Sequence, residues 1–174
     1  PVLRGAEGPL SGEPRGAISE ASRFLINEAL RADTHPLFVL CLGTIPNVAQ
    51  ALLARPDITN RIRVIWIGTQ PDDPCHESMH EFNAGNDIDA ANTVLMSGTS
   101  VWLIPSNVYS TMHIGLAELQ IKVRPWGAVG RFLFDQLTTY NMSDQASWTS
   151  GESWSLGDSP AVGIAMKPDC GTFH

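Results

Sequence analysis

The sequence is constrained most by three short, almost wholly apolar runs at residues 37–42, 63–67 and 101–104. Each run has the length of a β-strand and is too apolar to leave one face in water, which is typical of strands covered on both faces. Helical patterns lie between them at residues 47–55 and 87–97. Strands that alternate with helices form parallel sheets with right-handed crossovers. The sequence therefore predicts an α/β fold, with an open, mostly parallel sheet and flanking helices.

The other segments are predicted from helical spacing and turn residues. Residues 1–16 are rich in Gly and Pro and are expected to form a linker or loop, and residues 17–174 to form one α/β domain. Further helices are predicted at 17–30, 110–119 and 126–140, loops at 68–85 and 141–157, and a final apolar segment at 161–166. The long polar stretch at 68–85 is of a length that is usually functional or disordered.

The charge and the cysteines limit the classes of partner and the compartment that we expect for this chain. The 174 residues carry a net charge of −7, and the 11 Lys and Arg residues are scattered. Nucleic-acid binding needs clustered basic side chains, so we expect no nucleic acid partner. No basic run or long apolar stretch suggests a membrane. Three widely spaced cysteines and no targeting pattern favour a reducing compartment, the cytoplasm.

The predicted topology places the polar residues that could act chemically. Ligands in open α/β sheets bind outside the carboxyl ends of the strands. The loops that follow Leu42, Ile67 and Ile104 should therefore share one rim of the sheet.

Three blocks of sequence resemble the inosine-uridine preferring nucleoside hydrolases. Residues 38–47 (FVLCLGTIPN) are similar to that family's apolar strand and following turn. Residues 81–83 (EFN) with 87–98 are similar to its Glu-Phe-Asn segment and helix. Residues 157–162 (GDSPAV) are similar to a late element of the family. The order and spacing agree over most of the chain, which resembles the C-terminal portion of these enzymes and implies their fold, incomplete at the N-terminus.

The resemblance implies hydrolysis of the N-glycosidic bond of a ribonucleoside to free base and ribose, with water activated by a calcium ion. The sugar becomes oxocarbenium-like in the transition state, so carboxylates near the ring favour that state over the substrate. Calcium takes six to eight oxygen ligands and can hold water and sugar together.

The resemblance also assigns roles to residues. Glu81 and Asn83 match ribose-binding positions, and Asp158 matches a late metal ligand that also contacts ribose. Leu42 matches a position whose main-chain carbonyl binds calcium, and Ile67 one that lines the sugar pocket. Without the resemblance, Glu81 would be interpreted as a solvated acid, Asp158 as a helix N-cap and Ile67 as core packing.

Several positions depart from the family pattern. Cys75 stands where an Asn commonly contacts the 5′ end of the sugar, and Gly157 stands where many members have a His that protonates the leaving base. His76 and His80 are nearby candidates for a replacement acid, although loop histidines are more often simply solvated.

Three further residues have open or structural interpretations. Trp148 or Trp154 could stack on a purine, and packing without a ligand is an equal alternative. Asn47 begins a predicted helix and is interpreted as structural.

The largest departure is the lack of the family's acidic cluster, which supplies most calcium carboxylates and the general base. Nothing before Ala17 resembles it, and Asp72 and Asp73 lie in the wrong place and are interpreted as a solvated turn. We therefore expect the general base in an N-terminal segment missing from this chain, and weak or no activity of the chain alone. The alternatives are a noncatalytic nucleoside- or ribose-binding module and a protein-binding assembly domain. The sequence leaves homo-oligomerisation open.

Overall fold

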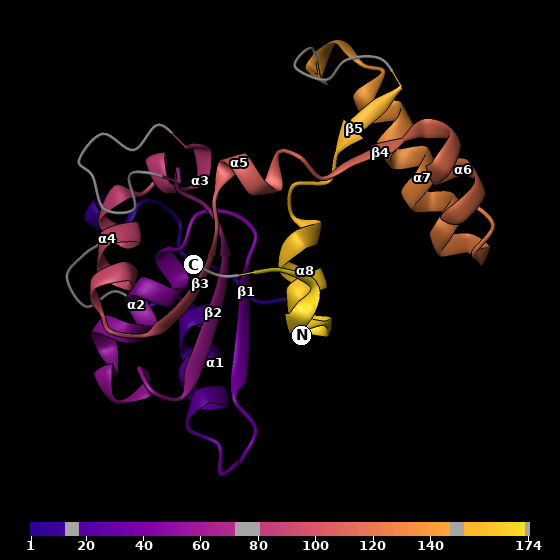
Figure 1. Ribbon diagram of the computed structural model, residues 1–174. Coiled ribbons are helices and arrows are strands. Elements are labelled where there is room, and N and C mark those ends of the chain that lie inside the picture. Colours follow the sequence, from indigo (N-terminus) through magenta and orange to yellow (C-terminus); the bar gives the residue numbers. More distant parts are fainter. Residues whose placement is uncertain (13–17, 72–80, 147–151, 173–174) are drawn as a thin grey trace. The chain divides into compact units, whose positions relative to one another are not determined.

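The computed structural model describes residues 1–12, 18–71, 81–146 and 152–172. The chain divides into two compact units: Pro1–Asn107 with Pro160–His174, and Val108–Ser159. The first unit contains the parallel sheet, and the second contains a short antiparallel strand pair with two helices (Figure 1).

The first unit is built on three parallel strands in the order β1-β2-β3: β1 (Leu37–Cys41), β2 (Ile62–Ile67) and β3 (Ser100–Ile104). Val39 pairs with Val64, and Val64 with Val101. The central strand is the most deeply buried, with Arg63 its only exposed residue. The predicted parallel sheet of apolar strands is confirmed.

Three helices provide the side chains that cover one face of this sheet. They are α1 (Glu20–Ala29), α2 (Pro46–Ala54) and α4 (Ile88–Met96). Alternate residues of β2 (Ile62, Val64 and Trp66) share one buried cluster with apolar residues of these helices. Side chains two apart on a strand point to the same face, so these three define the face that the helices cover.

The ends of the helices follow the sequence. Ser19 caps α1 by accepting a hydrogen bond from the Ser22 amide, and Asp87 caps α4 by accepting one from the Ala90 amide. Gly98, just after α4, has φ of +80°, a conformation that favours glycine. The predicted cap at Asp87 and stop at Gly98 are confirmed.

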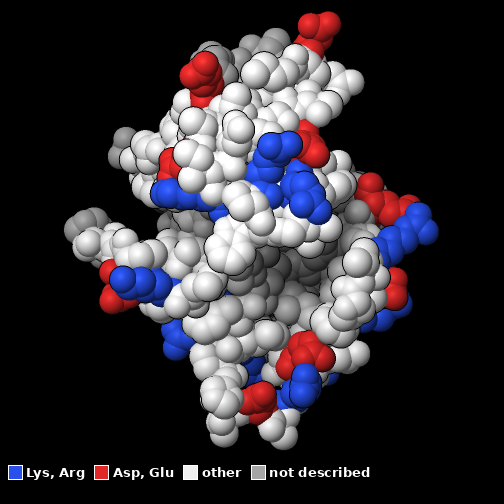
Figure 2. Space-filling view, turned by 90° about the vertical axis from the view of Figure 1, so that its right-hand side faces the viewer, with Lys and Arg blue, Asp and Glu red and all other residues white. Residues whose placement is uncertain are grey.

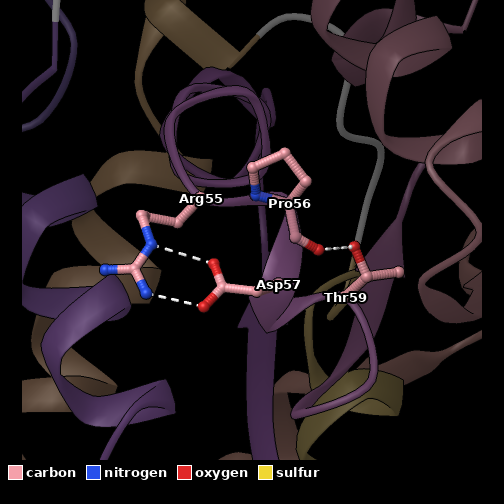
Figure 3. A network of polar contacts seen from close by, with 4 residues as sticks. All are labelled: Arg55, Pro56, Asp57 and Thr59. Atoms are coloured by element: carbon pink, nitrogen blue, oxygen red, sulfur yellow. Dashed lines mark hydrogen bonds and ion pairs between the residues drawn. The ribbon is translucent and has the colours of Figure 1, made fainter.

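The turn from α2 to β2 is held by polar contacts (Figure 3). The Arg55 guanidinium donates to both Asp57 carboxylate oxygens at 2.9 and 2.6 Å, and the Thr59 hydroxyl donates to the Pro56 carbonyl at 2.6 Å. Ile58 lies between them in the 3-10 helix Pro56–Ile58 and is fully buried. The turn thus fixes where β2 begins.

Two expectations about secondary structure are wrong. The stretch predicted as a helix at 110–119 contains β4 (His113–Gly115), preceded by α5 (Ser106–Tyr109) and followed by α6 (Leu116–Lys122). Gly115 disfavours a helix interior by about 1 kcal/mol, and β4 instead pairs with β5 (Ser153–Ser155).

The predicted loops also contain regular structure. The short helix α3 (Phe82–Gly85) lies within 68–85, and β5 and the 3-10 helix Asp144–Ala146 lie within 141–157. The segment predicted as apolar at 161–166 belongs to α8 (Ser159–Met166), which is followed by the 3-10 helix Pro168–Cys170.

The second unit is small and sparsely buried. It contains β4, β5, α6 and the longest helix, α7 (Gly127–Asn141). Its buried hydrophobic residues in the described part of the chain are Leu119, Ala146 and Trp154.

Residues 1–12 are tied to the first unit by hydrogen bonds and include the 3-10 helix Leu10–Gly12. The Ala6 amide donates to the Asn47 Oδ1 atom at 2.8 Å, and the Leu10 amide donates to the Asp87 carboxylate at 2.9 Å. Asn47 also accepts from the Ser19 hydroxyl at 2.9 Å, which supports its structural interpretation.

Two further observations concern the charges on the surface and the character of the helices. On the face shown in Figure 2, acidic and basic side chains are interspersed. Among the described residues, no helix has the length and apolar character needed to cross a membrane.

Candidate functional site

The loops at the carboxyl ends of the three strands are joined by hydrogen bonds, as the predicted rim requires. The contacts are Trp66 Nε1 to the Gly43 carbonyl (2.9 Å), the Gly68 amide to the Ile104 carbonyl (3.2 Å) and the Ser106 amide to the Thr69 carbonyl (3.1 Å). Each contact joins the carboxyl ends of two neighbouring strands or residues that closely follow them. The rim is therefore a connected piece of backbone, and the sheet sets its position.

Gly68 is required at this rim by close packing. A Cβ atom built on Gly68 would lie 2.6 Å from the ring of Trp66, which is fully buried. Because that ring also donates to Gly43, it has little freedom to move aside. The glycine lets the chain after β2 pass directly over the indole.

Glu81 is a buried carboxylate at this rim, with only 4% of its surface exposed. Its Oε2 atom accepts from the amides of Thr69 and Ala84, each at 2.9 Å, and its Oε1 atom accepts from the Asn83 amide at 3.1 Å. It is the N-cap of α3. The interpretation of Glu81 as a solvated acid is wrong, because three backbone amides compensate its burial.

Asn83 lies beside Glu81 and is oriented by the end of β2. Its Nδ2 atom donates to the Ile67 carbonyl at 2.8 Å. The Ile67 side chain is 2% exposed and belongs to the core, so the described contact of Ile67 with the site is through its carbonyl. The structure thus brings together Glu81, Asn83 and Ile67, three of the residues singled out from the sequence.

Thr69 is the feature of this rim that sequence reasoning missed. Its φ of +66° is the only positive value at a non-glycine residue in the described part of the chain. This backbone conformation costs an L-residue roughly 1–2 kcal/mol, and a β-branched side chain makes it an outlier. Its residue type carries no signal of the backbone angle, so the sequence offered no way to find it.

The side chain of Thr69 adds a second cost. The residue is fully buried, and its Oγ1 atom has no hydrogen-bond partner among the described residues. A buried hydroxyl left without a partner costs about 1–3 kcal/mol. Strain and an unpaired polar group therefore coincide at one residue, whose amide is bound to Glu81.

The two residues assigned to metal binding lie in different units. Leu42 directly follows β1 in the first unit, and its side chain is 42% exposed. Asp158 lies in the second unit, in the turn before α8, and partial burial raises the pKa of its carboxyl. Across residues 1–12, 18–71, 81–146 and 152–172, no group of three or more His, Cys, Asp or Glu side chains could hold a metal ion.

The other candidates divide between buried and undescribed positions. Trp154 lies in β5 and is 2% exposed, which favours packing over base stacking. Gly157, which stands where many family members have a His, lies close to Tyr109: a Cβ atom built on it would approach the Tyr109 ring at 3.3 Å. The remaining residues singled out from the sequence lie outside the described residues: Asp72, Asp73, Cys75, His76, His80 and Trp148.

Comparison with known proteins decides the family. The family profile described as inosine-uridine preferring nucleoside hydrolase matches residues 1–174. The chain belongs to this family of nucleoside hydrolases. The predicted resemblance is thereby confirmed. No match is found among curated protein sequences.

Solved nucleoside hydrolases share the fold of this family member. A plant nucleoside hydrolase aligns with a TM-score of 0.76 and 18% identity, over 99% of this chain and 62% of the other. A purine-preferring ribonucleoside hydrolase from Gardnerella vaginalis aligns with a TM-score of 0.71 and 23% identity, over 90% and 50%. An inosine-guanosine nucleoside hydrolase aligns with a TM-score of 0.72 and 20% identity, over 95% and 61%. The chain thus spans 50–62% of the length of these structures.

Proposed function

We propose that this protein hydrolyses the N-glycosidic bond of ribonucleosides to free base and ribose, and that Glu81 and Asn83 bind the ribose. The observation that carries the proposal is the buried Glu81 beside the half-buried Asn83 at the carboxyl end of β2, in a chain of this family. Such pairs of hydrogen-bonding groups suit sugar hydroxyls, which both donate and accept.

The chemistry of the reaction fits a fixed, buried carboxylate. Positive charge grows on the sugar as the glycosidic bond breaks, and a negative group nearby stabilises that charge more than it stabilises the neutral substrate. Glu81 is held by three amides, so it needs little rearrangement when the charge develops. Asn83 uses one N–H on Ile67, and this contact fixes the plane of its carboxamide.

The described residues do not fit a calcium site by themselves. The resemblance offers the Asp158 carboxylate and the Leu42 carbonyl, whereas calcium takes six to eight oxygen ligands. With two of these ligands, in separate units, most of the shell would be left to water. We expect hydrolysis by this chain alone to be slow. His76 and His80, the candidates for the acid that protonates the leaving base, fall outside the described residues.

The test is release of free ribose from inosine and uridine, measured with added calcium and with a chelator. Asn83→Ala should lower the rate at least about tenfold, because one hydrogen bond to a sugar hydroxyl is lost. Asn86→Ala is the matched control, because that exposed amide donates to the nearby Phe82 carbonyl at 2.7 Å and lies on the same short helical segment. Release that is the same in wild type and Asn83→Ala would contradict the assignment.

A second candidate is a noncatalytic ribose- or nucleoside-binding module that uses the same residues. The observation that favours it is that the described residues contain no cluster of metal-ligating side chains. Nucleoside binding that is insensitive to chelator, without ribose release, would establish this alternative. Absence of both binding and release would exclude the two candidates together.

The acidic chain, with its interspersed surface charges, is proposed to act on small nucleosides in the cytoplasm rather than on nucleic acid or a membrane. Homo-oligomerisation stays open.

A further inference from the structure

Thr69 combines two unfavourable features: a left-handed backbone at a β-branched residue and a buried hydroxyl without a partner among the described residues. Strained residues persist only where the surrounding structure enforces them, and they concentrate at ligand-binding sites. Both backbone groups of Thr69 are fixed, because its amide donates to Glu81 and its carbonyl accepts from Ser106. The direction of its side chain is therefore set by the rim.

The position of Thr69 joins it to the ribose-binding residues. Its amide nitrogen lies 2.9 Å from the Oε2 atom of Glu81. Asn83, the neighbour of Glu81 in this site, is bound to Ile67, two residues before Thr69. A group that enters beside Glu81 thus also approaches Thr69.

We propose that the Thr69 hydroxyl is a third ribose contact, which pairs with one sugar hydroxyl of the bound ribonucleoside. This inference rests on the proposed function. A threonine hydroxyl donates one hydrogen bond and accepts others, as a sugar hydroxyl does, so the two can satisfy each other.

Thr99 is a matched control within the same unit. It too has a buried hydroxyl without a partner in the described part of the chain, and it is 7% exposed. It precedes β3, at the amino end of the sheet and so opposite the rim. Thr99→Val therefore removes the same kind of group without touching the site.

The experiment measures inosine affinity and thermal unfolding for wild type, Thr69→Val, Thr69→Ser and Thr99→Val. Thr69→Val should weaken inosine binding about tenfold without lowering Tm, because valine keeps the branched shape and removes a hydroxyl that has no partner among the described residues. Thr69→Ser should bind within about threefold of wild type, and Thr99→Val should bind as wild type does.

Deoxy analogues identify the contact. The penalty of Thr69→Val should disappear for one of 2′-deoxy-, 3′-deoxy- and 5′-deoxyinosine, the one that lacks the contacted hydroxyl. Unchanged inosine binding by Thr69→Val would overturn the inference, and so would an equal penalty with all three analogues or a lowered Tm. Wild-type protein that binds no inosine would instead overturn the proposed function, and the Thr69 contact with it.

Discussion

The two units of the chain differ in how they bury apolar side chains. In the first unit, the sheet and three helices share a continuous buried cluster. In the second, the only buried residue of the 15-residue helix α7 is Gly130, although the helix carries Val129 and Phe132, 69% and 59% exposed. Large apolar side chains gathered on one exposed helix usually mark a surface that contacts something else. The first unit has the features of a self-sufficient core, and the second does not.

The largest effect is expected when two tryptophans, one in each unit, are replaced. Trp66 is fully buried in the first unit, and Trp126 is 77% exposed at the start of α7. Trp66→Ala should lower the free energy of unfolding by about 3–5 kcal/mol, because it leaves a cavity. Trp126→Ala should change it by less than about 0.5 kcal/mol. Chemical denaturation of both variants checks this, and equal losses would contradict the contrast.

A second pair of variants tests whether the second unit depends on Gly130, the one buried position of α7. A Cβ atom on Gly130 would meet the Val123 carbonyl at 2.1 Å, whereas Gly163 in α8 has no atom within 4 Å of its Cβ position. Gly130→Ala should destabilise the protein by about 1–3 kcal/mol through overpacking. Gly163→Ala should stabilise it by up to about 1 kcal/mol, since alanine favours a helix. Thermal unfolding measures both, and a neutral Gly130→Ala would show that α6 and α7 adjust freely.

A third test concerns the caps of two helices, one from each unit. Asp87 caps α4 and in addition accepts from the Leu10 amide, whereas α7 has no side-chain cap. Asp87→Ala should cost about 1 kcal/mol from the lost cap, and it should also loosen residues 1–12. Amide hydrogen exchange should show faster exchange at Leu10 and Ala90. Unchanged exchange at Leu10 would contradict the hydrogen bond between the Leu10 amide and Asp87.

The smallest expected effect is at the turn shown in Figure 3. The Arg55 guanidinium, through its hydrogen bond and charge, lowers the pKa of the exposed Asp57 carboxyl. A depressed folded pKa stabilises the fold above the unfolded value of about 3.9, and the gain is lost as pH falls through the folded value. Asp57→Asn should lower Tm slightly at neutral pH and not at strongly acidic pH. A difference that persists in acid would point to another cause.

The sequence predicted the parts of the structure that depend on burial. Apolar runs identified β1, β2 and β3 because parallel strands covered on both faces need apolar side chains throughout. The cap at Asp87 followed from local hydrogen bonding alone. The short strands β4 and β5 were not predicted, because three residues show no periodicity. Their pairing also joins segments about 40 residues apart in sequence.

The candidate site was predicted only in part. Glu81 and Asn83 were found through the family resemblance, which composition and spacing could not have replaced. The buried Glu81 accepts from backbone amides of α3 and from the amide of Thr69, which follows β2 and is distant in sequence. Such features are set by tertiary structure and cannot be predicted from the residue type alone.

The central claim is that the rim of the first unit binds ribose through Glu81 and Asn83 without a complete metal centre among the described residues. The most direct measurement is calorimetric titration of inosine in chelator, with wild type, Asn83→Ala and Asn86→Ala. We predict binding by wild type and Asn86→Ala, and a loss of at least about tenfold in affinity for Asn83→Ala. Equal binding by all three variants, or no binding until calcium is restored, would contradict the claim.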